Sequence, residues 1–298
     1  MSDDSLVVVI PSYSSPGSSI LPTLNSLEVS VRTWTSEPYT LVLSDSSPTD
    51  EVRKQCRSWA EKTGCTLVVE HSSHRLWLKE ALNVAYSRHE VTGADFVVVT
   101  NDDVLLDTNA VSRLLDTLKA NGDASIAVGC TRPDQNFSRG FARAGAFQLG
   151  AGARLATKLP LFRARAEGAL WATRGPFVGS FRYPIGEGSI ADDVELQEYI
   201  LRNGLLALNV SQAIAYKVPP ASFRDFASQN RRSMFAAARS SVAKGSKMLK
   251  LRAFVVEIAH DPLGALHYLS FRLLLKIGVG KDPNALTEKW ERSASTFR

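Results

Sequence analysis

The chain has 298 residues, of which 44% are hydrophobic and 22% charged, so it is long enough for one large α/β domain, with or without an appendage. Its formal net charge of +5 suits an anionic ligand such as a nucleotide diphosphate, although solubility alone explains it equally well. The sequence argues against two classes: no uncharged apolar stretch reaches the ~18 residues of a membrane-spanning helix, and basic residues without interleaved aromatics disfavour a nucleic-acid binder.

The cysteines and the first residues indicate a cellular setting. Cys56, Cys65 and Cys130 are few, odd in number and without metal-like spacing, which disfavours a disulfide framework or a zinc site. The apolar run Leu6–Ile10 is too short for a signal peptide and is typical of a strand. We therefore expect a reduced, cytoplasmic protein that is either free or peripheral on the cytoplasmic face of a membrane.

Strand and helix signals alternate through the first half of the chain. The predicted strands cover residues 6–10, 40–44, 66–70, 96–100 and 125–130, and the predicted helices cover 19–34, 49–62, 77–88 and 108–120. Apolar strand runs without alternation indicate strands buried on both faces. The pattern predicts an α/β fold with a mostly parallel sheet flanked by helices, in which ligands bind at the carboxyl ends of the strands.

The second half is less regular. Residues 132–170 are rich in Gly, Ala and Arg and predict a long basic excursion from the sheet, which is either functional or mobile. A strand signal returns at 170–173, and helices are predicted over 192–202 and 223–243.

The apolar tail from Leu249 to Ile277 is split by Pro262 and predicts two helices. The chain therefore divides into a domain over 1–243 and a helical extension over 244–298. The extension has two interpretations: it lies in a membrane interface with its cations toward anionic headgroups, or it packs on the core or forms a dimer interface. The cations in question are Lys244, Lys247, Lys250, Arg252, Arg272 and Lys276.

Two acidic clusters are candidates for chemistry. Asn101, Asp102 and Asp103 follow a buried strand, where carboxylates bind Mg²⁺ or Mn²⁺ together with phosphate oxygens. A turn or helix cap explains the same acids equally well. Asp192 and Asp193 begin a helix, where an acid could serve as a general base or simply meet the helix dipole.

Two further candidates are polar positions near strand and helix ends. Asp45, directly after a strand, could accept hydrogen bonds from a nucleobase or ribose, or act only as a turn residue before Pro48. Gln229 and Arg232 share one face of a predicted helix, and Arg232 could bind a diphosphate through its fork of donors. A solvated basic face is the alternative.

The order of these segments resembles that of family 2 glycosyltransferases, over roughly residues 5–240. The matching segments are Val8–Tyr13 (VVIPSY), Leu43–Ser47 (LSDSS), Lys79–Asn83 (KEALN), Asn101–Val104 (NDDV), Phe177–Phe181 (FVGSF), Asp192–Leu196 (DDVEL) and Gln229–Arg232 (QNRR). No single segment is specific, but seven in the family's order are unexpected by chance.

The resemblance implies a GT-A fold and inverting transfer from a nucleoside-diphosphate sugar, most often UDP-linked, to a hydroxyl acceptor. It implies that Asp103 holds the metal ion, Mg²⁺ or Mn²⁺, and that Asp193 is the catalytic base. Gly179 and Asp192 would contact the acceptor, a glycan or a lipid-linked sugar. The donor-binding residues that it implies are Pro11, Tyr13, Asp45, Lys79, Asp102, Gln229, Arg231 and Arg232.

The departures from the family pattern define the alternatives. Asn101 replaces the first acid of the Asp-x-Asp motif, and Ser233 replaces a Trp that stacks on the acceptor in processive synthases, so we expect a single addition. The same departures are compatible with an inactive carbohydrate-binding protein. A sugar nucleotidyltransferase is disfavoured because Pro11–Gly17 is not a Gly-rich phosphate loop.

Overall fold

The computed structural model describes most of the chain, in stretches separated by gaps. The described residues are 4–14, 18–134, 140–158, 169–186, 192–220, 222–223, 225–227, 230 and 247–276. The predicted helix over 223–243 falls largely outside this part.

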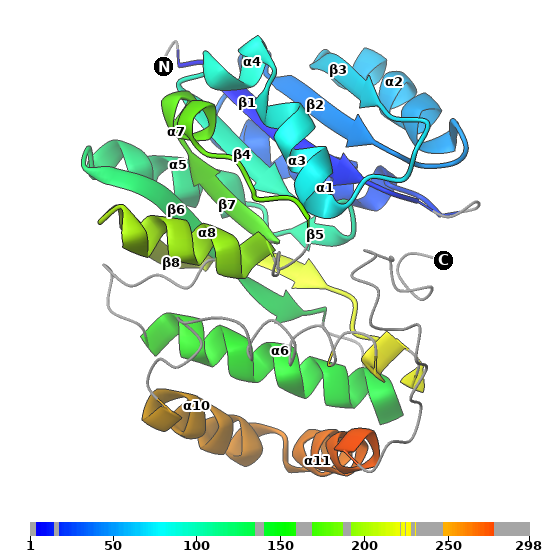
Figure 1. Ribbon diagram of the computed structural model, residues 1–298, viewed down its shortest axis with the longest axis vertical. Coiled ribbons are helices and arrows are strands. Elements are labelled where there is room, and N and C mark those ends of the chain that lie inside the picture. Colours follow the sequence, from blue (N-terminus) through cyan, green and yellow to red (C-terminus); the bar gives the residue numbers. More distant parts are fainter. Residues whose placement is uncertain are drawn as a thin grey trace.

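An eight-stranded mixed sheet runs through the molecule in the order β3-β2-β1-β4-β7-β6-β8-β5 (Figure 1). The strands are β1 (Leu6–Ser12), β2 (Thr40–Asp45), β3 (Thr66–His71), β4 (Phe96–Thr100), β5 (Val104–Leu106), β6 (Ala124–Pro133), β7 (Leu170–Thr173) and β8 (Leu206–Lys217). The first four strands are parallel, whereas β7 is antiparallel to both β4 and β6, and β5 is antiparallel to β8. The prediction of a mixed, mostly parallel sheet flanked by helices is confirmed.

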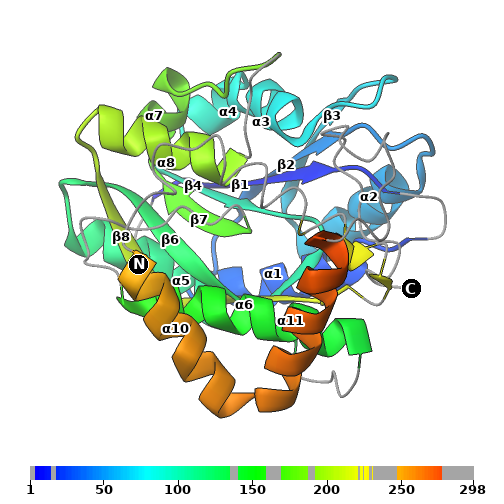
Figure 2. The same cartoon turned by 60° about the horizontal axis from the view of Figure 1, so that its bottom comes forward.

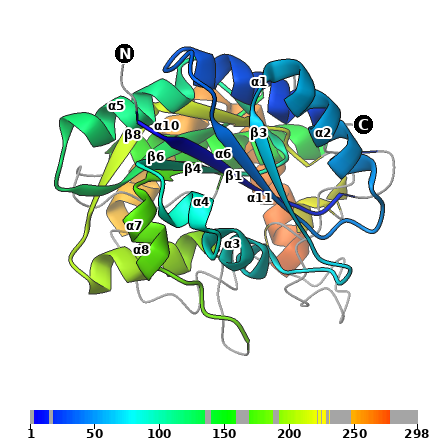
Figure 3. The same cartoon turned by 90° about the horizontal axis from the view of Figure 1, so that it is seen from above.

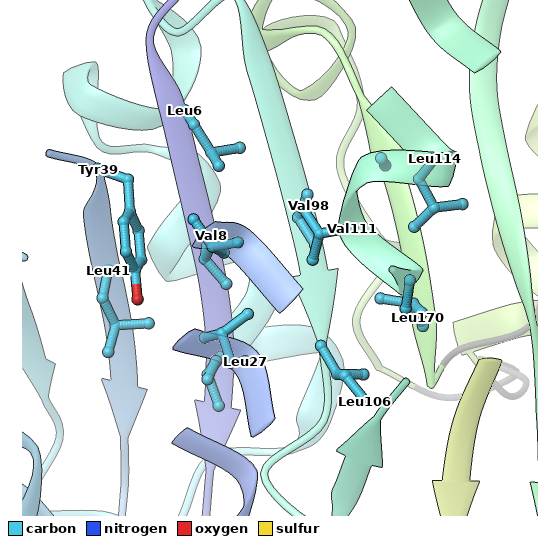
Figure 4. Close-up of a cluster of buried hydrophobic side chains, with 14 of the residues drawn as sticks. Leu6, Val8, Leu27, Tyr39, Leu41, Val98, Leu106, Val111, Leu114 and Leu170 are labelled. Carbon is cyan, nitrogen blue, oxygen red and sulfur yellow. The ribbon is translucent and has the colours of Figure 1, made fainter. Parts of the chain in front are cut away.

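One face of the sheet is covered by α1 (Leu21–Arg32), α2 (Glu51–Thr63) and α5 (Ala110–Ala120). Val8 of β1 points into this layer (Figure 4), and both Val8 and Ile10 are fully buried in one cluster with helical leucines. The helices form here because their apolar residues recur at helical spacing, and α2 ends where Gly64 adopts a left-handed φ of 73°.

The other face is covered by α3 (Leu78–Tyr86), α4 (His89–Thr92), α7 (Gly175–Ser180) and α8 (Asp192–Arg202) (Figure 3). Val7 and Val9 point to this side, because successive side chains of a strand alternate between faces. Burial on both faces explains why the parallel strands are continuous apolar runs rather than alternating ones.

The structure differs from the sequence-based expectation in the segment 132–170. Instead of an excursion with little regular structure, most of the described part forms α6 (Gly140–Lys158), a helix of 19 residues. Its glycines obscured the pattern, but two of them lie at close packing contacts: a Cβ at Gly145 would lie 2.4 Å from Pro220 Cδ, and one at Gly150 would lie 2.3 Å from the end of the Glu257 side chain. Both positions are close approaches of α6 to other segments.

The tail forms two helices, as Pro262 predicts: α10 (Lys247–His260) and α11 (Pro262–Lys276). Both lie against α6, on the side away from β1 to β3 (Figure 2). Phe147 of α6 is buried between them, with ring centroids 5.2 Å from Phe254 and 5.5 Å from Tyr268. Within the described part of the chain, no helix has the length and apolar character needed to cross a bilayer.

Candidate active site

The carboxyl ends of β1, β2 and β4 are joined by hydrogen bonds into one edge. Ser12 of β1 is paired in register with Asp45 of β2, and the Ser12 carbonyl accepts a hydrogen bond from the Ser46 amide at 3.0 Å. The Ser12 hydroxyl donates to Asp102 Oδ2 at 2.7 Å, in the loop after β4. These contacts bring the predicted acidic loops to a single edge, where parallel sheets bind ligands.

Asp102 is held in the protein interior at this edge. The whole residue is buried. Its carboxylate accepts a hydrogen bond from the Ser12 hydroxyl, and its backbone carbonyl accepts one from the Thr23 hydroxyl at 3.0 Å. It ties β1, α1 and the loop after β4 together. Its contact with the donor stays a prediction.

Asp103 lies at the same edge beside a lysine that sequence reasoning missed. Lys217, the last residue of β8, is paired in register with Val104, and its Nζ lies 3.4 Å from Asp103 Oδ2. The other oxygen, Oδ1, is buried and has no hydrogen-bond partner among the described residues. A buried carboxylate oxygen of this kind is costly unless a ligand or an ion satisfies it.

This arrangement fits a divalent cation that shares its coordination with a ligand. Among the described residues there is no group of three or more His, Cys, Asp or Glu side chains that could enclose a metal ion. Mg²⁺ is usually held by one or two carboxylates together with phosphate oxygens and water. Asp103, with one oxygen unsatisfied, could supply such a carboxylate.

Asp45 is fully buried and is the centre of an ion-pair network. Its Oδ2 contacts Arg53 Nη1 and lies 3.5 Å from His71 Nδ1, while its Oδ1 accepts the Ser47 amide at 3.0 Å. Ser47 in turn accepts the Ser14 amide through its hydroxyl at 2.9 Å. Both carboxylate oxygens therefore already have partners, and Asp45 shapes this edge through Arg53 and His71.

The loop after β1 carries two further predicted residues. Pro11 is buried within β1, opposite Ser44 of β2, and ends the apolar run of the strand. Tyr13 is half-buried, and the Arg75 guanidinium lies 4.1 Å from its ring centroid, a cation–π geometry. Tyr13 and Arg75 therefore present a flat, positively charged element next to the Asp45 network.

The first turn of α8 meets the start of α3. Lys79 Nζ of α3 lies 3.1 Å from Glu195 Oε1 of α8, and both side chains are largely buried. Burial and then the neighbouring Asp193 charge raise the pKa of Asp192 from 3.8 to about 7, against the opposing effect of Lys79. Asp193 Oδ1 accepts the Val194 amide at 2.9 Å, which places Asp193 at the amino end of the helix.

Asn83 ties α3 to the segment that follows α7. Its side chain exchanges two hydrogen bonds with the backbone of Tyr183, at 2.8 and 2.9 Å. Gly179, in contrast, lies in α7, where the nearest side chain to it is Thr92 of α4 and the neighbouring Gly175 amide donates to Ala94 just before β4. Gly179 is therefore at the amino edge of the sheet and is not brought together with the acidic residues.

The sequence of residues 7–171, more than half of the chain, matches the family model described as glycosyl transferase family 2. The chain belongs to glycosyl transferase family 2. Membership makes it a glycosyltransferase, and the acidic edge just described lies where the predicted motifs of the family fall. No curated protein sequence matches at a significant level.

Solved structures of other proteins share the fold of this glycosyltransferase. The mannosyltransferase PcManGT from Pyrobaculum calidifontis, solved with GDP-Man and Mn²⁺, is 16% identical with a TM-score of 0.55, over 95% of this chain and 77% of that one. TarS from S. aureus in complex with UDP is 13% identical with a TM-score of 0.52, over 92% of each chain. At these identities the likeness establishes the GT-A fold and no finer property.

Three donor-site predictions lie outside the described residues: Gln229, Arg231 and Arg232. The structure adds cations that the motifs did not mark, namely Lys217, Arg53 and Arg75, with His71 beside Arg53. The sequence offered little to find these residues. Lys217 ends a 12-residue strand that was not predicted. Arg53, Arg75 and His71 lie on a helix or in segments at strand ends, without a distinctive spacing.

Proposed function

We propose that this glycosyltransferase moves one sugar from a nucleoside-diphosphate donor to a hydroxyl acceptor with inversion at the anomeric carbon. We favour a UDP-sugar as the donor. The observation that carries the proposal is the Asp103 carboxylate at the carboxyl edge of the sheet, with Lys217 beside one oxygen and no partner on the other. Family membership supports glycosyl transfer in general, and the donor, acceptor and stereochemistry are our inference.

Asp103 would hold Mg²⁺ or Mn²⁺ through the unsatisfied oxygen. When bound, the ion would neutralise negative charge on the departing diphosphate. Lys217 is next to that position, so its ammonium would add positive charge on the same side, and Arg231 and Arg232 are proposed to do the same. The complex of PcManGT with GDP-Man and Mn²⁺ supports the choice of ion.

Asp193 would take the proton from the acceptor hydroxyl as that hydroxyl attacks. Asp192 is proposed to contact the acceptor, and its pKa near 7 is the direct effect of burial and of negative charge on Asp193. Asp193 lies at the amino end of α8 next to Asp192, where its carboxylate would serve as the general base. Lys79 is close enough to favour the ionised form of Asp192.

The nucleoside end of the donor would lie along the loops after β1 and β2. Asp45 holds Arg53 and His71 at this edge, and Tyr13 carries Arg75 on its face. An aromatic ring and guanidinium groups suit a nucleobase and phosphate oxygens respectively. We propose a glycan or a lipid-linked sugar as acceptor, and a cytoplasmic or peripheral location.

Incubation of the purified chain with a panel of UDP- and GDP-sugars, with and without Mn²⁺, tests the proposal. We expect nucleoside diphosphate to be released from one donor, with strong dependence on Mn²⁺, and ¹H NMR of the first product to show the inverted anomer. Release of pyrophosphate from a sugar phosphate and a nucleoside triphosphate would instead identify a nucleotidyltransferase. Tight donor binding without turnover with any hydroxyl acceptor would identify an inactive binding protein.

A further inference from the structure

The two C-terminal helices carry a row of large apolar side chains that point away from the protein. We call this surface the outer face, and it consists of Leu251, Val255 and Val256 of α10 and Leu263, Leu266, Leu269 and Leu273 of α11. Their exposed fractions run from 39% to 61%. On α11 the four leucines recur at spacings of three and four residues, so they form one continuous stripe along the helix.

The exposed stripe is separate from the apolar face that these helices bury in the protein, because their opposite faces are already packed. Phe254 and Tyr268 contact Phe147 of α6, and Phe271 stacks on Phe141 with ring centroids 4.4 Å apart. Ala253 and Ala265 are buried on that inner side. The helices therefore have two apolar faces, one that docks on α6 and one that is exposed, and an exposed apolar patch indicates an interaction surface.

The charges of the two helices are sorted in the same way. Residues 247–276 contain five Lys and Arg but only two acids, Glu257 and Asp261. Glu257 is buried against Gly150 of α6, and Asp261 pairs with Arg143 of α6 at 2.7 Å. Arg252, by contrast, is exposed beside Leu251 and Val256. Arg272 turns inward, where its guanidinium donates to Asn230 Oδ1 at 3.2 Å and lies over the Tyr268 ring. Both acids thus face inward, and the outer face is apolar with the exposed cation Arg252.

We propose that the outer face binds the surface of a membrane that contains anionic lipids, with α10 and α11 lying flat in the interface. Apolar side chains would enter the acyl boundary while cations meet the headgroups. Figure 2 shows that both helices lie at one side of the molecule, where a flat surface can contact them together. This binding does not depend on glycosyl transfer, so its test is independent of the proposed function.

Charge complementarity decides between a lipid surface and a second copy of the chain. A symmetric dimer through this face would bring Arg252 of one copy toward Arg252 of the other, with both acids of these helices turned inward and so unable to pair with it. An anionic membrane supplies the missing negative charge. The membrane is therefore the occupant that the structure favours.

Vesicle flotation of the full chain tests the proposal, with neutral phosphatidylcholine vesicles compared with vesicles in which roughly a third of the lipid is phosphatidylglycerol. We expect the protein to float with the anionic vesicles and far less with the neutral ones. The double variant Leu266→Glu and Leu269→Glu should bind at least about tenfold more weakly, because two leucines no longer enter the lipid. Arg252→Ala should weaken binding to anionic vesicles about fivefold.

Val29→Glu is the matched control, because Val29 is 52% exposed on α1, outside the outer face. It should bind vesicles like the wild type, and circular dichroism should show all variants folded. The proposal is overturned if wild-type protein floats with neither vesicle, or if the double variant floats as well as Val29→Glu. It is also overturned if analytical ultracentrifugation shows a dimer that the double variant abolishes while vesicle binding is absent.

Discussion

Replacing Lys217 by Met should tighten the binding of Mn²⁺ to the free enzyme. Lys217 Nζ lies 3.4 Å from Asp103 Oδ2, so a metal ion at Asp103 has to compete with an ammonium that is already there. Met keeps most of the length and apolar character of the side chain but removes the charge. Loss of the competitor should leave the carboxylate more available to the ion.

The size of the effect follows from the geometry of the pair. Two unit charges at this distance attract by about 5 kcal/mol at an effective dielectric constant of about 20. Desolvation of the pair and exposure of 28% of the Lys217 side chain offset most of this attraction. The net stabilisation left to the Lys217–Asp103 pair is about 1–2 kcal/mol, which is typical of a charged hydrogen bond. Removing it should lower the dissociation constant for Mn²⁺ by about 5- to 30-fold.

Electron paramagnetic resonance of free Mn²⁺ during titration measures this constant without any need for turnover. Lys54→Met is the control, because Lys54 forms an exposed ion pair with Asp50 at 2.9 Å, elsewhere on the protein. It should leave Mn²⁺ binding unchanged, and Asp103→Asn should abolish the specific site. If Lys217→Met binds Mn²⁺ no more tightly than Lys54→Met does, Lys217 does not compete with a metal at Asp103 and the reasoning fails.

Three other substitutions test different parts of the account. Asp193→Asn should lower turnover by about 10²- to 10⁴-fold while leaving donor affinity, measured by calorimetry, within about twofold; unchanged turnover would exclude Asp193 as the base. The pKa of Asp192 is higher in the folded state than in the unfolded chain, so the folded state holds this proton more tightly. The stability that the protonated Asp192 contributes is fully present below the unfolded pKa of 3.8 and is lost as pH rises through about 7. Asp192→Asn removes that loss and should gain about 1–2 kcal/mol over wild type between pH 4 and pH 8 in urea unfolding; a gain independent of pH would contradict the shift. Gly145→Ala should destabilise by about 1–3 kcal/mol because the new Cβ meets Pro220, whereas Gly152→Ala, with open space around it, should be neutral or stabilising in the same thermal melts.

The parallel half of the sheet could be predicted from sequence because its local and tertiary requirements agree. Val97, Val98 and Val99 of β4 are apolar in succession since both faces of the strand are covered. Pro262 likewise predicted the break between α10 and α11, because proline favours the first turn of a helix and disrupts an interior.

The elements that could not be predicted from the sequence are those whose residue types depend on contacts with residues remote in the chain. The glycines of α6 lower its helix propensity, yet Gly145 and Gly150 are there to admit Pro220 and Glu257, which are remote in sequence. The strand β8 is half-exposed and has two register irregularities against β6, so its alternation is broken. In both cases tertiary packing overrides the local signal.

The site shows the same division. The acidic positions at strand and helix ends were accessible to motif reasoning, since their place at the carboxyl edge follows from chain order in a parallel sheet. The contacts that set their chemistry were not, because the partners of Asp45 and Asp103 come from other elements. Asp102 and Gly179 are motif positions whose described contacts are structural, and their roles toward donor and acceptor stay predictions.

The central claim is that Asp103 and Asp193 act on one sugar diphosphate with a metal ion between protein and phosphate. A crystal structure of the protein with UDP and Mn²⁺ tests this most directly. We predict that the ion bonds to the Asp103 carboxylate and to diphosphate oxygens, and that Asp193 faces the vacant sugar position beyond the second phosphate. An ion bound away from Asp103, or an Asp193 side chain directed into a separate region from the diphosphate, would contradict the account.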